Sequence, residues 1–142
     1  MEPIQVVVDT NVLVAAVRSR NGASSKLLSG VGDPRWKINI STALLLEYES
    51  ALKRTLKEQG RPLELADEAV DGLLSVARRQ NIAVRYRPVL SDPGDDFVLE
   101  LAVEAGAAYV ITFNTKDFKG LNRFGICVVR PGEFLRILEG CP

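Results

Sequence analysis

The stretch Ile4-Gln5-Val6-Val7-Val8-Asp9-Thr10-Asn11 decides the fold class of this chain. Its first five residues form a nearly continuous β-branched run, which is typical of a strand buried on both faces, as in a parallel sheet. A helical pattern follows from Asn11 to Val17. Asp9 therefore stands where a buried strand ends and a helix begins.

The rest of the chain repeats this alternation. We expect further strands at residues 36–40, 82–85, 108–112 and 126–129, and helices at 23–31, 42–59, 63–79, 93–106 and 131–138. Ser41 or Thr42 is the expected cap of the longest helix, and Gly60 and Pro62 end it. Strands alternating with helices favour an α/β fold with an open, mostly parallel sheet and helices on both faces.

The composition is that of an ordinary globular protein. With 142 residues, 46% of them hydrophobic and 25% charged, the chain predicts a single domain over residues 1–142 with a core of its own. No apolar run approaches the ~18–20 residues that span a bilayer. The N-terminus enters a strand without a basic segment or signal region, which predicts a cytoplasmic location. Cys127 and Cys141 do not suggest a disulfide framework.

The charge balance restricts the ways in which this chain binds a partner. Basic and acidic residues number 18 each, so the net charge is zero. A protein that binds nucleic acid through phosphates alone is expected to be basic. We therefore expect positive charge gathered on one face and acids gathered in an active site. The chain has no histidine, which excludes histidine-based nucleases, Ser-His-Asp hydrolysis and His-containing zinc sites.

Acidic residues recur at element ends or between apolar residues. They are Asp9, Glu47, the pair Asp95-Asp96, and Asp117. A buried carboxylate is costly unless it is paired or holds a metal ion. Without histidine, such a set predicts oxygen-only coordination of a hard cation, Mg²⁺ or Mn²⁺. Phosphodiester hydrolysis is the leading use of such a site.

Each acid also has an ordinary structural explanation. Asp9 would serve equally well as a helix N-cap, and Glu47 would by itself be a surface residue. Asp92 is best interpreted as the cap of the helix that begins at Pro93. Asp95 shares a helix face with apolar residues four and seven positions on, whereas Asp96 lies about a hundred degrees round the helix.

A phosphate-accepting aspartate, as in receiver or haloacid-dehalogenase domains, is the main alternative for Asp9. The second of these classes expects another Asp two residues on, where Asn11 stands. A receiver expects a lysine on a late strand, and Lys116 falls in a loop. Most basic clusters are expected to be solvated faces. Lys116, Lys119 and Arg123 lie next to the predicted site, and we expect them to contact a phosphate backbone.

Four motifs in order resemble the PIN domain family. They are Asp9-Thr10-Asn11 after the first strand, residues 41–47 leading into the long helix, residues 92–96 followed by Ala102 and Gly106, and residues 110–118. Each motif is weak, but their order covers nearly the whole chain. The resemblance implies a three-layer α/β/α sandwich with a five-stranded sheet in the order 3-2-1-4-5. It also implies a metal-dependent endoribonuclease, closest to the toxin components of toxin–antitoxin pairs.

The resemblance also implies roles for single residues. Asp9, Glu47 and Asp95 carry over as catalytic metal ligands for Mg²⁺ or Mn²⁺. The fourth acidic position of the family falls at Asn114, and Asp117 is the candidate to replace it. The residues expected to orient these ligands are Thr10, Asn11, Asp96 and Thr112.

The partners expected on this basis are an RNA substrate, an antitoxin protein and a second copy of the chain. The apolar faces of the helices at 42–59 and 63–80 would form such an interface, unless they only close the core. The leading alternative function is a catalytically inactive PIN-like module for RNA binding or assembly.

Overall fold

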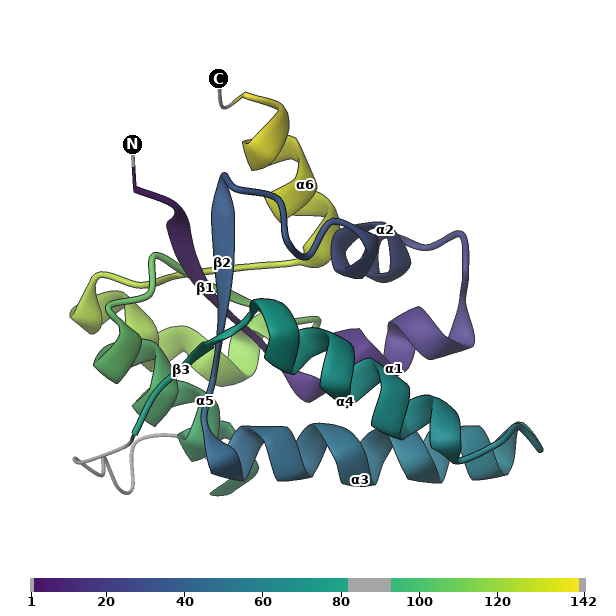
Figure 1. The fold of residues 1–142 in the computed structure, drawn as a ribbon. Coiled ribbons are helices and arrows are strands. Elements are labelled where there is room, and N and C mark those ends of the chain that lie inside the picture. The colour runs from purple at the N-terminus through teal and green to yellow at the C-terminus, as the bar shows by residue number, and fades with distance from the viewer. Residues whose placement is uncertain (1, 82–92, 141–142) are drawn as a thin grey trace.

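The structure, a computed structural model, describes residues 2–81 and 93–140, with side chains from residue 97 onward in the second stretch. The elements follow one another along the chain as strands and helices (Figure 1). The strands are β1 (Ile4–Val8), β2 (Trp36–Ile40), β3 (Arg78–Arg79), β4 (Tyr109–Ile111) and β5 (Cys127–Val129). The helices are α1 (Thr10–Arg18), α2 (Ala23–Ser29), α3 (Thr42–Glu58), α4 (Glu64–Val76), α5 (Pro93–Ala105), the 3₁₀ helix η1 (Thr115–Phe124) and α6 (Pro131–Glu139).

The strands form one parallel sheet in the order β3-β2-β1-β4-β5. Val6 pairs with Ile38 of β2 on one side and with Tyr109 of β4 on the other. The α/β fold and the strand order expected from the resemblance are therefore confirmed. Since all the strands run the same way, their carboxyl ends meet at one edge of the sheet.

The sheet is covered on both faces. Figure 1 shows α1, α2 and α4 on one side of the sheet and α5 on the other. The side chains of Val6, Val7 and Val8 are fully buried, as the β-branched run of the first strand predicts. Helix α5 brings Leu99 and Leu101 into the core from the opposite face. No helix in the described part of the chain is long and apolar enough to cross a membrane.

The region around β3 differs from the sequence-based expectation. The helix predicted over 63–79 ends at Val76, because Ala77 adopts an extended backbone conformation. Arg78 and Arg79 instead form β3 and pair with Asn39 and Ile40. Pairing with the edge of β2 overrides the local helical periodicity. The strand predicted at 82–85 and the cap predicted at Asp92 lie outside the described residues.

The segment after β4 is more ordered than the polar loop that its sequence suggests. It forms the 3₁₀ helix η1, which begins after Asn114. Phe118 and Leu121 are fully buried and attach it to the core. The backbone at Phe118 is not helical, so a kink divides the segment into two short helical pieces. Gly125 ends it with a positive φ of 74°, a conformation that favours glycine. This anchoring fixes the backbone of the segment that carries Asn114 and Asp117.

The start of α3 gives a test of local stability. Ser41 is the N-cap, and its hydroxyl oxygen accepts a hydrogen bond from the Leu44 amide at 3.2 Å. Ser41→Ala should lower the free energy of unfolding by about 1 kcal/mol, since the amide loses its partner. Urea denaturation measures this. Ser50→Ala, at an exposed position inside the same helix, is the matched control and should not destabilise the protein. Equal stability of the two variants would contradict the capping role.

Candidate functional site at the carboxyl edge of the sheet

Asp9 is a buried acid at the end of β1. Its residue is 8% exposed, and its backbone amide donates to the carbonyl of Ile111 at 2.9 Å, which extends the β1–β4 pairing by one residue. The Thr112 hydroxyl donates to Asp9 Oδ2 at 2.7 Å. Asp9 is also the N-cap of α1, but its side chain makes no capping hydrogen bond. The carboxylate is therefore directed to the site rather than to the helix.

Thr112 joins the ends of β1 and β4. Besides donating to Asp9, its hydroxyl oxygen accepts from the Asn114 amide at 3.0 Å and from Asn11 Nδ2 at 3.4 Å. Asn11 Oδ1 in turn accepts from the Phe113 amide at 3.3 Å. Thr112 is fully buried, and its hydroxyl uses its single donor and both acceptor positions. This network fixes the orientation of the Asp9 carboxylate.

Glu47 reaches the same region from α3. The Thr10 hydroxyl donates to Glu47 Oε2 at 2.8 Å, which joins the first turn of α1 to the second turn of α3. Glu47 is partly exposed. It therefore combines a fixed orientation with access to solvent, as a ligand for an ion or a bound water requires.

Tyr48 lies beneath the two acids. Its hydroxyl donates to the Val8 carbonyl, at the end of β1. Burial raises the pKa of Tyr48 well above its usual value of 10.0, and the negative charges of Asp9 and Glu47 raise it further. Tyr48 follows Glu47 in α3, and its hydroxyl reaches the residue before Asp9, so the two acids lie in one neighbourhood.

The polar residues that follow β4 lie on the surface of the molecule. Asn114 and Asp117 are both exposed, and the Asp117 amide donates to the Asn114 carbonyl at 3.0 Å in the first turn of η1. Lys116, Lys119 and Arg123 are exposed on the same 3₁₀ helix, and Arg123 lies 5.3 Å from the centre of the Phe124 ring. Because η1 begins after the carboxyl end of β4 and leads into the amino end of β5, Lys116 lies nearest the carboxyl edge of the sheet and Arg123 lies farthest from it.

Asp95 and Asp96 belong to the first turn of α5, where side chains are not described. The backbone still places them. Helix α5 leads into β4 at the amino end of that strand, so its own first turn lies toward the carboxyl edge. The backbone of Asp95 is thus at the same edge of the sheet as Asp9.

The donor chemistry fits a hard divalent cation. Asp9 and Glu47 offer carboxylate oxygens, which such ions prefer as ligands. Asn114 lies near them, since its backbone amide donates to the Thr112 hydroxyl that also contacts Asp9. Among the described side chains, no group of three acids or cysteines is close enough to hold a metal ion. A third acid from the first turn of α5 would complete such a set, and Asp95 is the residue that we expect to supply it.

Comparison with known proteins identifies the architecture. The chain matches the family model of the PIN domain over residues 5–116. The chain belongs to the PIN domain family. A comparison with curated proteins finds no match.

Solved structures share the PIN fold with this chain. VapBC-1 from nontypeable Haemophilus influenzae has a TM-score of 0.62 at 16% identity, over 91% of this chain and 99% of that one. VapBC2 from Rickettsia felis, bound to a promoter DNA fragment, has a TM-score of 0.60 at 16% identity, over 88% and 97%. PAE2754 from Pyrobaculum aerophilum has a TM-score of 0.56 at 15% identity, over 96% and 90%. At these identities the similarity is one of fold.

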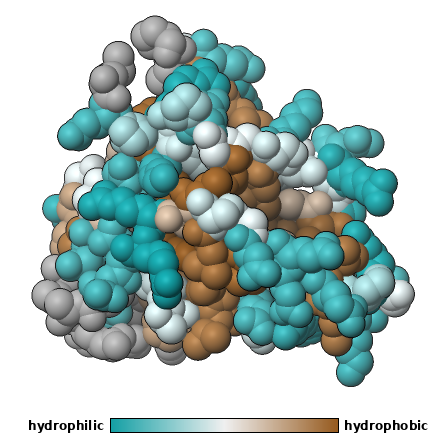
Figure 2. Space-filling view, viewed as in Figure 1, coloured by the Kyte–Doolittle hydropathy of each residue, from teal (hydrophilic) through white to brown (hydrophobic). Residues whose placement is uncertain are grey.

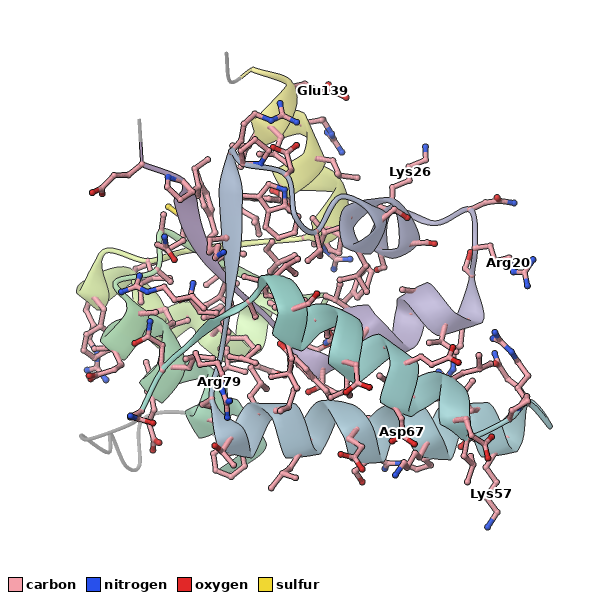
Figure 3. All side chains as sticks on the ribbon, viewed as in Figure 1. Arg20, Lys26, Lys57, Asp67, Arg79 and Glu139 are labelled. Atoms are coloured by element: carbon pink, nitrogen blue, oxygen red, sulfur yellow. The ribbon has the colours of Figure 1, made fainter. Side chains whose placement is uncertain are left out.

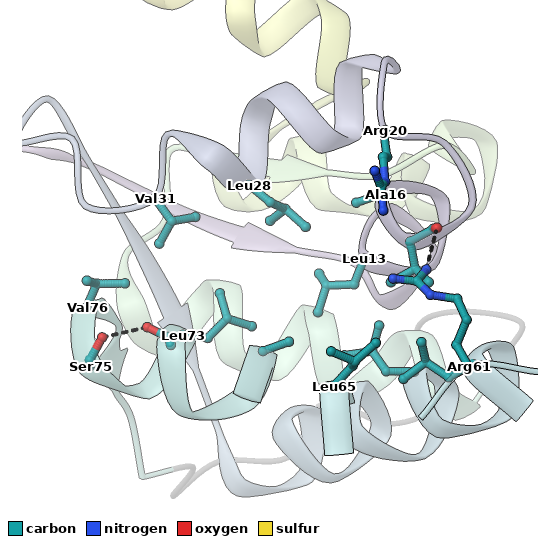
Figure 4. Close-up of a pocket in the computed structure, with 15 residues that line it drawn as sticks. Leu13, Ala16, Arg20, Leu28, Val31, Arg61, Leu65, Leu73, Ser75 and Val76 are labelled. Atoms are coloured by element: carbon teal, nitrogen blue, oxygen red, sulfur yellow. Dashed lines mark hydrogen bonds between the residues drawn. The ribbon is translucent and has the colours of Figure 1, made fainter. Parts of the chain in front are cut away.

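This PIN domain also has an apolar groove between α1, α2 and α4, of about 650 Å³. Figure 2 shows hydrophobic side chains gathered in a hollow between α2 and α4. In Figure 4, Leu28 and Val31 face Leu65 and Leu73 across it. The groove exists because α4 packs against α3 and does not close onto α2.

Two arginine side chains lie at one end of the groove. Arg20 and Arg61 are both exposed there (Figure 4). Arg61 donates to the Val17 carbonyl at 3.5 Å and to Gln59 at 3.1 Å. The groove is therefore apolar along its length and positive at this end.

Sequence reasoning missed Glu100. This residue lies in α5 and is only 2% exposed, so it is a second deeply buried acid. The signal was present, since Glu100 stands between Leu99 and Leu101 just as Glu47 follows a run of leucines. Its burial became visible only when α5 was packed against the sheet.

The raised pKa of Tyr48 gives a prediction about alkaline stability. Above about pH 10 the unfolded chain loses the tyrosine proton that the folded protein keeps, so the free energy of unfolding should fall as pH rises. Tyr48→Phe should be less stable at pH 8 by about 1–3 kcal/mol, because the buried Val8 carbonyl loses its donor. The variant should also show a shallower alkaline decline.

Urea denaturation at a series of pH values from 8 upward measures both effects. Tyr109→Phe, which removes the hydroxyl of a half-buried tyrosine in β4, is the control and should keep the wild-type decline. A parallel decline in wild type and Tyr48→Phe would contradict the prediction.

Proposed function

We propose that this PIN domain is a metal-dependent endoribonuclease that hydrolyses RNA phosphodiester bonds. The observation that supports it most is the pair Asp9 and Glu47, which hydrogen bonds from Thr112 and Thr10 orient at the carboxyl edge of a parallel sheet. Ligands of such sheets bind beyond this edge, where the strand order changes direction. Here that point lies between β1 and β4.

The proposed ligands of Mg²⁺ or Mn²⁺ are Asp9, Glu47 and Asp95, with Asn114 or Asp117 at the fourth position. A cation held there would lower the pKa of a bound water and polarise the scissile phosphate. The chain's own contribution is orientation. Thr112 holds Asp9, and Thr10 holds Glu47, so that neither carboxylate has to be ordered when the ion binds.

The cations of η1, Lys116, Lys119 and Arg123, are proposed to bind the RNA backbone. All three are exposed on η1, and Lys116 lies in the turn that also carries Asn114 and Asp117. They concentrate positive charge locally in a chain whose net charge is zero. This arrangement favours attraction of phosphates to the edge that holds the acids.

An RNA cleavage assay with Mg²⁺ or Mn²⁺ on a pool of structured RNAs tests the nuclease. Asp9→Asn and Glu47→Gln keep the side-chain shapes and remove the charges. Each should lower the cleavage rate by more than about a hundredfold, since loss of an outer partner alone costs about 10–100-fold at metal sites. Glu49→Gln, an acid of the same helix paired with Lys53 at 2.8 Å, is the control and should cleave as wild type does.

Two other results would redirect the interpretation. Cleavage by wild type that survives both Asp9→Asn and Glu47→Gln would contradict this site. Absence of cleavage together with absence of Mn²⁺ binding by calorimetry would favour the alternative, an inactive PIN-like module for RNA binding or assembly.

We further propose that the protein is the toxin of a toxin–antitoxin pair and that an antitoxin segment occupies the groove between α1, α2 and α4. Two of the solved neighbours are VapBC complexes, which suggests an antitoxin partner. The groove fits the apolar face of an amphipathic helix. Arg20 and Arg61 at one end favour an acidic residue at the matching end of that helix.

Filling the groove should separate partner binding from catalysis. Ala69 is exposed and lines the groove, so Ala69→Arg obstructs it without disturbing the core. We expect the variant to lose co-purification with the co-expressed product of the neighbouring gene while RNA cleavage stays at the wild-type rate. Glu68→Arg, at the adjacent exposed position, should keep the complex. Retention of the complex by Ala69→Arg would exclude this groove.

A further inference from the structure

Two neighbouring arginines, Arg78 and Arg79, form the short strand β3 at one end of the strand order. Both are exposed. In the part of the chain that the structure describes, neither arginine forms an ion pair with a carboxylate. The proposed hydrolysis uses cations only on η1, beyond β4, so the charge of β3 has no role in it.

The two arginines lie on opposite faces of the sheet, because successive residues of a strand alternate. Arg78 pairs with Asn39 and shares its face, whereas Arg79 pairs with Ile40 and shares the other face. Figure 3 shows the Arg79 side chain extending from β3 toward the start of α3. Glu47 lies in the second turn of that helix. Only Arg79 is therefore directed toward an element that supplies an acid of the site.

The sheet register places Arg79 at the same edge as Asp9. Ile40 pairs with Arg79. The register of β1 with β2 puts Ile40 in the row of Val8, the residue before Asp9. Neighbouring strands lie about 4.8 Å apart, so the backbone of Arg79 is roughly 10 Å from that of Val8. Arg79 thus stands near the carboxyl edge, on the side of β1 that is opposite β4.

A buried polar network holds this end of β3 in place. The Gln80 amide donates to the Ile40 carbonyl at 2.9 Å, and Gln80 Nε2 donates to Asn39 Oδ1 at 3.3 Å. Asn39 is fully buried and donates in turn to the Val6 carbonyl at 3.2 Å. The backbone directly after Arg79 is therefore tied to the two central strands. An arginine carried by a fixed element loses less freedom when it binds a ligand.

The acids lie between two cationic positions. Asp9 follows β1, which stands between β3, with Arg79, and β4, which leads to Lys116. Strands β3 and β4 are three strand spacings apart, roughly 14 Å. An RNA strand held on one side of the acids only would pivot, whereas contacts on both sides fix the scissile bond relative to them. Cations on both sides also offset the repulsion between the carboxylates and the RNA phosphates.

A phosphate is a better match for Arg79 than an acidic side chain of a protein partner. The apolar groove has its own arginines, Arg20 and Arg61, and Arg79 does not line it. A guanidinium group binds a phosphate through two parallel hydrogen bonds, which fixes direction as well as distance.

We propose that Arg79 binds a phosphate of the RNA substrate on the side of the acids opposite Lys116, so that the RNA crosses the carboxyl edge of the sheet from β4 to β3. The proposal rests on the proposed function, since it extends the substrate path of that nuclease. Arg79 positions the RNA and takes no part in the hydrolysis itself. Arg78, on the other face, contributes nothing to this path.

Binding without cleavage tests the path separately from catalysis. A fluorescein-labelled oligouridine is titrated with the protein in EDTA at several salt concentrations, and fluorescence anisotropy gives the dissociation constants. Arg79→Gln should weaken binding by about two- to fivefold, the range of an exposed ion pair. It should also lower the slope of log affinity against log salt by about 0.7, the value for one phosphate contact of a single strand.

Two further variants show whether the position of the charge matters. Arg78→Gln removes the same charge from an equally exposed neighbour on the opposite face, and it should bind RNA as wild type does. Arg79→Lys keeps the charge and should keep the wild-type salt slope. A merely structural role of Arg79 would not follow this pattern, since the salt slope counts phosphate contacts.

A double variant tests whether one RNA molecule contacts both cations. If it does, the losses of binding free energy in Lys116→Gln and Arg79→Gln should add in the double variant. If RNA instead bound at either cation alone, each single variant would lose at most about twofold, and the double variant would lose far more than the sum. That second pattern would contradict the proposed path.

The outcomes separate the two proposals. Wild-type affinity and salt slope in Arg79→Gln, equal losses in Arg78→Gln and Arg79→Gln, or no RNA binding by wild type would each overturn the role of Arg79. An Arg79→Gln variant that binds RNA normally but loses the product of the neighbouring gene would assign Arg79 to a protein partner and overturn it too. Arg79-dependent binding in a protein that does not cleave RNA would support the path and remove the nuclease.

Discussion

The buried carboxylate of Asp9 is the constraint on which the site depends. Placing a charged group at 8% exposure costs several kcal/mol unless hydrogen bonds or an ion compensate for lost water. Its described partner, Thr112, comes from the strand beside it, more than a hundred residues later in the chain. Thr112 therefore stabilises the acid only where β1 is paired with β4. The same strand pairing thus forms the centre of the sheet and orients the acid of the site.

Tyr48 connects this acid to the core. Its hydroxyl donates to the carbonyl of Val8, and its ring is fully buried under the two carboxylates. An ionised phenol there would face two negative charges in a poorly solvated environment, so the proton stays. Tyr48 is thus an uncharged residue packed beneath Asp9 and Glu47, and the negative charge of the site belongs to the two carboxylates.

Helix α1 takes part in both surfaces of the molecule. Its first turn contributes Thr10 and Asn11 to the acidic site, and its later residues, Leu13 and Val17 among them, line the apolar groove. A partner seated in the groove would contact the same rigid helix that holds Glu47 through Thr10. The acidic site and the apolar groove are therefore separate surfaces that α1 connects.

The sequence by itself determined the parts of the fold that rest on local patterns. The β-branched run before Asp9 marked a buried strand, the cap at Ser41 marked the start of α3, and alternation of strands and helices gave the fold class. Asp9 and Glu47 were singled out only as members of an ordered set of motifs, since Asp9 alone could be a helix cap and Glu47 alone a surface residue. Tertiary structure decided what depends on distant partners. Arg78 and Arg79 form a strand because β2 offers them an edge, and Glu100 is buried because α5 packs against the sheet. Gln80 lies beside the row of Asp9 through sheet register alone. These features arise from contacts between residues far apart in the chain, which local periodicity does not encode.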